Sequence, residues 1–303
     1  MKQRTAALSV ASNSALILLK VLAGVLTGSV AILTEAVHSM VDLVASLVAF
    51  LSVRIADEPA DETHRYGHEK IENLAAALEG ILILVGSAGI ALAAIRRLVS
   101  GGSTHTVGIG IAVIGLSAIV NLIVSAVIAR RGRLTDSPAL EGDAAHLRTD
   151  ALSSLVVLVA LVLVAVTHEQ WIDPVAALLV AALIVVTGVR LVIRSGEVLV
   201  DQSLPAAERD AIAGVIESFS SHGVIGFHEL RTRRAGSQRY VDVHIQFRAG
   251  TSLEDAHGTA HELQDQIVSR LGGADVLIHL EPEGRLRPGQ RPLAETSEQV
   301  DGG

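Results

Sequence analysis

Six long apolar stretches lie within the first 200 of the 303 residues, and they limit the possible folds more than any other feature. A helix needs about 20 consecutive apolar residues to cross the hydrocarbon core of a bilayer. Stretches near this length lie at residues 8–28, 31–54, 72–99, 107–129, 140–166 and 173–194. They predict a polytopic α-helical membrane protein with six transmembrane helices within residues 1–200.

The amino-acid composition agrees with a bilayer and limits the chemistry of any binding site. Half of the residues are hydrophobic, yet only 2% are aromatic, as is typical of small aliphatic helices packed in lipid. The formal net charge of −8 argues against nucleic acid as a partner. Because the chain has no cysteine, His, Asp and Glu are the side chains expected to bind a metal ion.

The positively charged residues predict the side of the membrane on which the termini lie. Six spans return the chain to its starting side, where ten basic residues fall, whereas Arg96 and Arg97 fall on the other side. The ten are Lys2, Arg4, Arg54, Arg65, Lys70, Arg130, Arg131, Arg133, Arg190 and Arg194. Cytoplasmic loops carry an excess of Lys and Arg. We therefore expect a protein of the cell inner (plasma) membrane with cytoplasmic N- and C-termini.

Residues 201–285 have the composition of a soluble domain. Helical spacing of apolar residues marks 205–219 and 252–271, and the second of these opens on a Ser cap. The stretch "QRYVDVHIQF" alternates as a strand does, and strands are also expected in "GFHELRTRRAG" and "ADVLIHLEP". This order predicts a cytoplasmic α+β domain (αββαβ, ferredoxin-like or metallochaperone-like). Residues 286–303 are expected to be a disordered tail.

Two histidine–aspartate pairs with identical spacing lie inside the apolar stretches. His38 precedes Asp42 by four residues, and His146 precedes Asp150 by four, so each pair shares one helix face. An ionisable residue at membrane depth costs on the order of 2.5–3.5 kcal/mol on insertion scales. Taken alone, either pair can simply hydrogen-bond to a neighbouring helix. Together the pairs supply two imidazoles and two carboxylates, a complete four-coordinate shell for Zn²⁺.

Asp143 lies one turn before His146 and has two interpretations. It can orient the imidazole from the second coordination shell, or it can be an ordinary acidic residue at the start of the helix.

A further candidate lies between the second and third stretches, where Asp61, His64 and His68 have the spacing D-x-x-H-x-x-x-H. This cluster can bind a metal on a short helical turn, or it can be a solvated polar loop.

The predicted soluble domain contains several more candidate ligands. His228 and His244 lie on adjacent predicted strands, and His279 and Glu281 share a face of the last one. His257 and His261 lie one turn apart in the second helix. Surface histidines without a metal are common, so some of these six residues are expected to have no ligand role.

The two HxxxD pairs, the six stretches and the αββαβ order resemble the cation diffusion facilitator family, in its bacterial zinc/proton antiporter type. The resemblance covers roughly residues 8–285, and its strongest further matches are "DETHRYGHEKIE" at 61–72 and "VDQSLP" at 200–205. It implies a second zinc site in the loop and a salt bridge between Lys70 and Asp201 at the hinge of a homodimer. It also implies a cytoplasmic binuclear zinc site on His228, His244, His257, His279 and Glu281.

In that pattern Glu281 stands where prototype bacterial members have Asp, and His261 has no assigned role.

The function implied by the resemblance is proton-coupled export of divalent cations. Zn²⁺ is the first candidate for both transport and regulation, with Cd²⁺, Fe²⁺, Co²⁺ and Ni²⁺ as additional ions. Two alternatives from other classes stay open. One is an intramembrane zinc-dependent hydrolase, which needs an open coordination position and a general base. The other is a metal sensor that does not transport.

Overall fold

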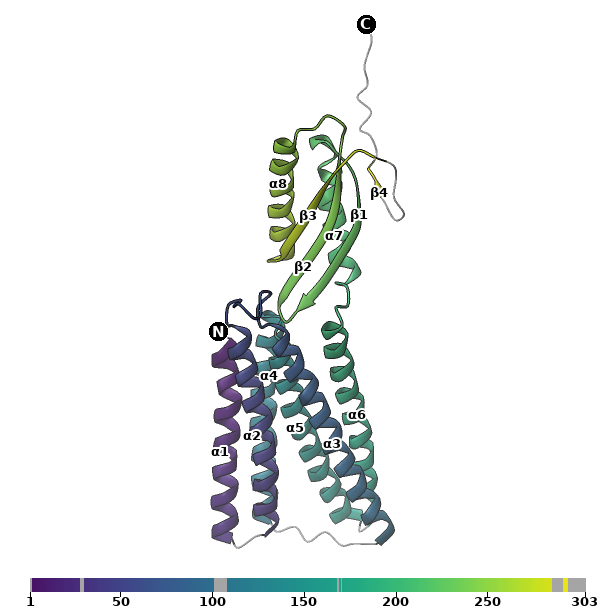
Figure 1. Cartoon of the computed structure of the whole chain (residues 1–303). Coiled ribbons are helices and arrows are strands. Elements are labelled where there is room, and N and C mark those ends of the chain that lie inside the picture. The colour runs from purple at the N-terminus through teal and green to yellow at the C-terminus, as the bar shows by residue number, and fades with distance from the viewer. Residues whose placement is uncertain are drawn as a thin grey trace. The chain divides into compact units, whose positions relative to one another are not determined.

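The structure is a computed structural model that describes residues 2–27, 30–100, 108–167, 169, 171–284 and 291–293. It divides into two compact units, Met1–Leu199 and Val200–Gly303, which are described separately. The first unit is helical and the second contains a small sheet (Figure 1).

The first unit consists of long helices, each of which coincides with one of the apolar stretches. They are α1 (Lys2–Thr27), α2 (Val30–Ala56), α3 (Lys70–Ser100), α4 (Gly108–Leu134), α5 (Pro138–Thr167) and α6 (Ile172–Leu199). Four segments in the described residues are long and apolar enough to cross a membrane: Lys2–Ala23, Lys70–Arg96, Gly115–Leu134 and Pro174–Leu199. Spanning by α2 and α5 as well stays a prediction.

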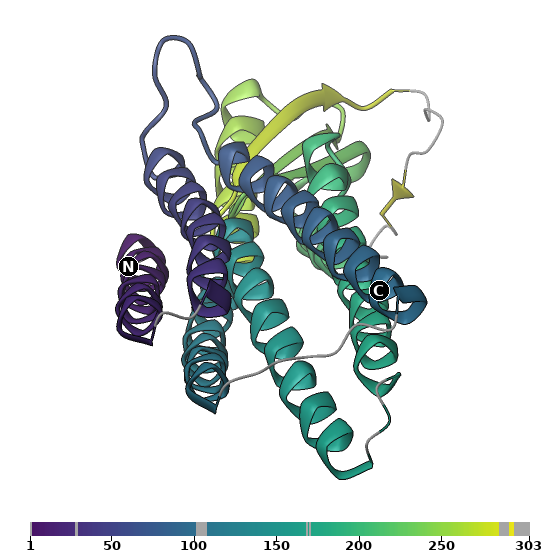
Figure 2. The ribbon, with the colours of Figure 1, turned by 90° about the horizontal axis from the view of Figure 1, so that it is seen from below.

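The helices pack as a group of four and a pair. Helix α1 lies along α2 and α4 lies along α5, while α1 also meets α4 and α2 meets α5. The pair is α3 and α6, which contacts the group mainly through α5 (Figure 2). Glycines bring α3 and α6 close together, because a Cβ on Gly80 would lie 2.7 Å from Val192 Cγ2. Small residues at such crossings are typical of membrane helices.

The second unit has the predicted order of elements. These are α7 (Ala206–Ser218), a 3₁₀ turn η1 (Ser220–His222), β1 (Val224–Ala235), β2 (Gln238–Phe247), α8 (Leu253–Leu271), β3 (Asp275–Pro282) and β4 (Arg291–Pro292). The sheet order is β3-β2-β1-β4, in which β2 pairs antiparallel with β1 and parallel with β3. Ser252 caps α8 by accepting a hydrogen bond from the amide of Asp255.

Strand β4 is a difference from the expected disordered tail. Arg291 and Pro292 pair with Phe227 and Gly226 on the edge of β1 that faces away from β2. The rest of the predicted tail, apart from Leu293, lies outside the described residues.

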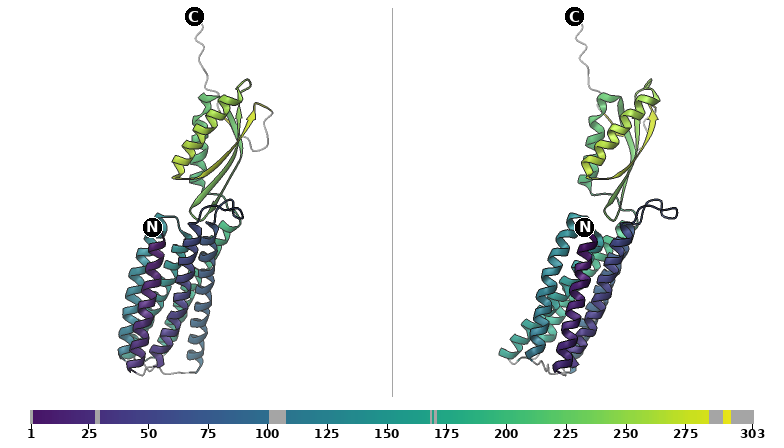
Figure 3. Two further views of the ribbon diagram at one scale, coloured as in Figure 1. Left: turned by 60° about the vertical axis from the view of Figure 1, so that its left-hand side comes forward. Right: turned by 90° about the vertical axis from the view of Figure 1, so that its left-hand side faces the viewer.

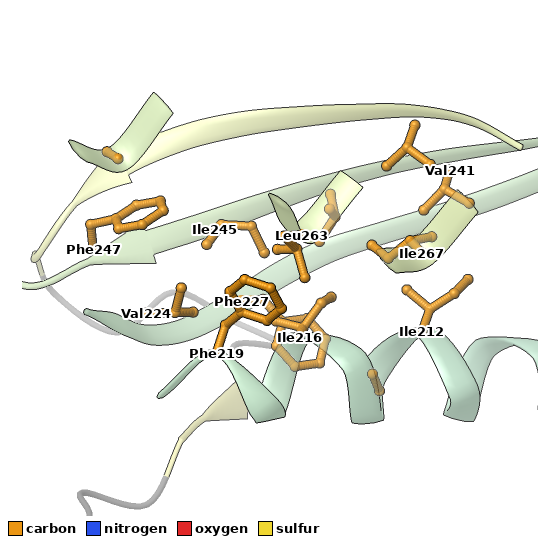
Figure 4. Close-up of a cluster of buried hydrophobic side chains, with 14 of the residues drawn as sticks. Ile212, Ile216, Phe219, Val224, Phe227, Val241, Ile245, Phe247, Leu263 and Ile267 are labelled. Carbon is orange, nitrogen blue, oxygen red and sulfur yellow. The ribbon is translucent and has the colours of Figure 1, made fainter. Parts of the chain in front are cut away.

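Helices α7 and α8 cover one face of this sheet (Figure 3). Ile212 and Ile216 of α7 and Leu263 and Ile267 of α8 pack against alternate residues of the strands (Figure 4). Those strand residues include Phe227, Val241, Val243, Ile245, Phe247 and Val276. Since neighbouring strand residues point to opposite faces, the histidines between them lie on the face away from the helices.

Candidate metal centres

The first group of possible ligands lies inside the helical unit. Nε2 of His146 on α5 lies 3.4 Å from Oδ1 of Asp42 on α2 and 3.6 Å from Oδ2 of Asp150. Asp42 and His146 are each only 6% exposed. Ligand atoms of the three residues all lie within 4.8 Å of one another. The structure therefore joins residues more than a hundred positions apart into a compact group with donors suited to Zn²⁺.

His38 is the fourth predicted member of this group. Helix α2 is continuous from Val30 to Ala56 and so preserves the four-residue spacing to Asp42. The side chain of His38 itself lies outside the described residues, so its ligand role stays a prediction.

Asp143 takes part in contacts that neither interpretation of the sequence included. Its Oδ1 accepts hydrogen bonds from Ser9 on α1 and Ser46 on α2, at 2.9 and 3.1 Å. The described contacts include no hydrogen bond between Asp143 and His146, whose Nδ1 is buried without a partner in that part of the chain. In this structure Asp143 thus ties α5 to α1 and α2 and does not orient the imidazole directly.

The loop group is also brought together. Asp61 lies 3.5 Å from Nδ1 of His64 and 3.3 Å from Nε2 of His68. Residues 57–69 form turns and bends and not the expected short helical turn. Oδ1 of Asp61 accepts hydrogen bonds from the amides of His64 and Thr63 and from the Thr63 hydroxyl. These bonds, the one from His64 first, hold the pKa of Asp61 well below its usual range.

The third group lies on the face of the sheet opposite α7 and α8. Oε1 of Glu281 is 3.1 Å from Nδ1 of His244, and Oε2 is 3.6 Å from Nε2 of His228. His279 lies beside His244, with ring centroids 4.6 Å apart and its Nε2 3.8 Å from Oε1 of Glu281. Both ring nitrogens of His228 are buried and have no hydrogen-bond partner among the described residues. Four of the five predicted ligands therefore meet.

The fifth predicted ligand, His257, does not join them within one chain. Helix α8 turns Ala256, Ala260, Leu263 and Ile267 into the core on the other side of the sheet. His257 is exposed and lies next to His261, with their Nε2 atoms 3.1 Å apart. Within a single chain His257 lies apart from Glu281, because the helix that carries it covers the opposite face of the sheet, and its ligand role stays a prediction.

The predicted hinge pair of Lys70 and Asp201 would join residues of different units and stays a prediction. Within the second unit, Asp201 has a positive φ of 60° and its Oδ1 lies 3.6 Å from Nη1 of Arg233. Lys70 begins α3 in the first unit.

Comparison with known proteins gives the same two units. The family model described as "Cation efflux transmembrane domain" matches residues 6–200, and "Cation efflux protein, cytoplasmic domain" matches residues 204–283. The chain belongs to the cation diffusion facilitator family. It is a membrane protein with a transmembrane cation efflux domain and a C-terminal cytoplasmic domain.

Relatives of this cation diffusion facilitator cover nearly its whole length. An uncharacterised transporter of Synechocystis sp. is 36% identical over 95% of this chain and 92% of its own. The cation-efflux pump FieF of Salmonella paratyphi A is 34% identical over 92% of each chain. A solved structure of CzrB, described as a zinc transporter candidate, is 32% identical with a TM-score of 0.26, covering 27% of this chain and 99% of that one.

Two acidic residues near these centres were missed from the sequence. Glu229 has a positive φ of 50° at a bulge in β1, and its Oε2 lies 3.7 Å from Nε2 of His244. In a regular strand it would face away from its neighbour His228, so alternation gave no signal. Glu79 lies in α3 and is completely buried. The sequence could have indicated Glu79, because a carboxylate inside an apolar stretch usually has a function.

Proposed function

We propose that this cation diffusion facilitator is a proton-coupled antiporter that exports divalent cations, with Zn²⁺ as its main substrate. The observation that carries the proposal is the buried group of Asp42, His146 and Asp150 between α2 and α5. His38 would complete a shell of two imidazoles and two carboxylates. Imidazole and carboxylate together suit Zn²⁺, whereas all-oxygen sites favour Mg²⁺ or Mn²⁺. Cd²⁺, Fe²⁺, Co²⁺ and Ni²⁺ are additional candidate substrates.

Proton coupling follows from the choice of ligands. A neutral imidazole binds a metal ion, but a protonated imidazole cannot, so metal and proton compete for the same nitrogen. If the group opens alternately to the two sides of the membrane, an inward proton gradient drives the metal outward. The absence of thiolates suits a carrier, because it must release its ion as well as capture it.

The helices pack as two groups, and this division fits a mechanism of alternating access. The four-helix group α1, α2, α4 and α5 holds Asp42, His146 and Asp150, and the pair α3 and α6 lies beside it. Rocking of one helix group against the other around a midplane site is a known way to expose a substrate to each side in turn. In our proposal, both termini and the second unit face the cytoplasm.

The other two groups would bind regulatory zinc. The sheet cluster of His228, His244, His279 and Glu281 gathers three imidazoles and a carboxylate on the face of the sheet opposite α7 and α8, and the ring nitrogens of His228 have no hydrogen-bond partner among the described residues. Zinc bound there would shift the conformation of the membrane domain in a homodimer. In that homodimer the Lys70–Asp201 pair would link the membrane and cytoplasmic parts. The loop group of Asp61, His64 and His68 would bind a further ion.

The test is zinc flux in proteoliposomes under an imposed pH gradient. Asp42→Ala and Asp150→Ala are expected to abolish flux, whereas Asp210→Ala, at an exposed position of α7, should transport as the wild type does. Undiminished flux in the first two variants would refute the shared site. Hydrolysis of lipid or peptide without flux would favour the hydrolase, and zinc binding without flux would favour the sensor.

A further inference from the structure

Glu79 of α3 is a fully buried carboxylate that the proposed mechanism does not use. Its exposed fraction is 0%. Neither Oε1 nor Oε2 has a hydrogen-bond partner among the residues that the structure describes. An ionised carboxylate buried without a partner costs far more than a protein can normally supply, so such a group binds a cation or takes up a proton.

The helices leave a specific space for this side chain. Helix α5 approaches α3 at Gly142, where a Cβ would lie 2.8 Å from Oε2 of Glu79 and 3.2 Å from Cα of Ala76. A side chain at position 142 would therefore collide with the carboxylate. The glycine lets Glu79 lie against α5 at Gly142, which directly precedes Asp143 and lies four residues before His146.

The surroundings of Glu79 contain few other charges. Asp143 and His146 of α5 both act on it electrostatically. Asp143 is held by Ser9 of α1 and Ser46 of α2, and Asp42 of α2 lies against His146. From α6, the atoms near Gly80 belong to Gly188 and Val192, and Arg194 is engaged by Glu141. On α3 itself, Glu72 binds Lys2 and Ser137.

The geometry favours a proton over a second metal ion at this position. A metal ion needs several donors around one point, and the three ligand groups in the described part of the chain do not include Glu79. A proton needs only one carboxylate oxygen. The neighbouring carboxylate of Asp143 makes it still harder to keep Glu79 ionised, because two adjacent acids resist carrying charge together.

We propose that Glu79 is a proton-binding site separate from the metal ligands and carries a proton that the transporter exchanges for metal. The inference rests on the proposed antiport. When a divalent cation occupies the Asp42–His146–Asp150 group, its charge favours breaking the Glu79 O–H bond. The proton leaves to water and the electron pair stays on the carboxylate. Release of the metal reverses this step, and Glu79 takes up a proton from the other side.

Proton release during zinc binding tests this directly. Full-length wild type and Glu79→Gln are titrated with zinc in weakly buffered detergent solution, and released protons are counted with a pH indicator. Glu79→Gln is expected to bind zinc at the Asp42–His146–Asp150 group and to release about one proton fewer per chain. The matched control is Glu141→Gln, because Glu141 adjoins Gly142 but pairs with Arg194 at the surface. It should release as many protons as the wild type.

Four results distinguish failure of this inference from failure of the proposed antiport. Unchanged proton release in Glu79→Gln would overturn the proposal, and so would loss of zinc binding at that group, since Glu79 would then act as a ligand. If Glu79→Gln does not fold, Gly142→Ala moves the carboxylate without removing it and should shift the pH at which the proton is released. An unshifted release would again overturn the inference. Absence of zinc flux in wild-type proteoliposomes would instead refute the antiport, while the binding titration would still report on Glu79.

Discussion

The intramembrane group and the loop group contain the same kinds of ligand, yet they are held in place by different means. In the loop, Asp61 accepts hydrogen bonds from Thr63 and His64, so the carboxylate organises its own turn. In the bundle, Asp42 and Asp150 project from helices whose backbone hydrogen bonds are already satisfied, and both approach the imidazole of His146. The helix backbone holds these carboxylates in place, so their oxygens are not needed to shape the helices.

This contrast separates effects on function from effects on structure. A substitution in the intramembrane group removes a donor but leaves the helices intact, so its effect should appear in transport. A substitution of Asp61 removes both a donor and the bonds that shape the loop. The sheet cluster is a third case, because His228 is 2% exposed and both of its ring nitrogens lack hydrogen-bond partners among the described residues.

The largest expected effect is that of His146→Ala. The imidazole lies against both carboxylates, so its loss removes the nitrogen donor common to the described contacts of the group. Zinc flux should fall by more than about 100-fold, since loss of a residue that merely orients a ligand already costs roughly 10- to 100-fold. The measurement is initial flux in proteoliposomes at matched protein content.

The control for this substitution is His222→Ala, at an exposed histidine of η1. It should leave flux unchanged. Both variants should show the helical content of the wild type by circular dichroism. If His146→Ala lost its helical content, its effect would be structural, and the contrast between bundle and loop would fail.

His228→Leu is expected to have an intermediate effect on the free energy of unfolding. The sign of this effect depends on whether zinc is present. Without zinc, the variant should be at least as stable as the wild type, because two buried unsatisfied nitrogens are removed and each costs about 1–3 kcal/mol. With zinc at 100 times its dissociation constant, the wild type should gain about 2.7 kcal/mol, and the variant should lose most of that gain. Thermal unfolding of the full chain with and without zinc measures both quantities.

His279→Leu provides the comparison, because the His279 side chain is 61% exposed. It should lose part of the zinc-dependent stabilisation without becoming more stable in the absence of metal. Equal stabilisation of the wild type and His228→Leu by zinc would exclude a metal role for the sheet cluster.

What could be foreseen from the sequence was local and periodic. The pairing of Asp42 with His146 and Asp150 followed from the four-residue spacing in two apolar stretches, and the shared face of His279 and Glu281 followed from strand alternation. Both periods depend on the backbone alone. The sequence also gave the order of the elements in the second unit.

What could not be foreseen depends on contacts between distant segments. The partners of Asp143 are Ser9 and Ser46, which reach it only because α1 and α2 pack against α5. His257 lies away from the sheet cluster because α8 covers the opposite face, and no local pattern states which face a helix will cover. Glu229 turns toward His244 only because β1 bulges after His228.

The smallest expected effect on transport is that of Asp61→Asn. The amide keeps an oxygen that can accept the bonds from Thr63 and His64, so the turn should persist, while the loss of charge weakens metal binding. Zinc affinity of the loop should fall by roughly 10- to 100-fold. Flux should change less than about twofold, since the intramembrane group is untouched. Calorimetry and flux assays on the same preparation measure the two effects.

The pH dependence of the wild-type loop sharpens this prediction. The pKa of Asp61 is lowered by its hydrogen bonds, so the stabilisation they give is present above the unfolded pKa of about 3.9 and is lost as the pH falls through the lower folded value. The turn formed by Thr63 and His64 should therefore stay ordered between about pH 5 and 8, which the dispersion of their amide resonances measures. Disordering of the turn within that window would show that the loop depends for its shape on a bound ion and not on the hydrogen bonds of Asp61.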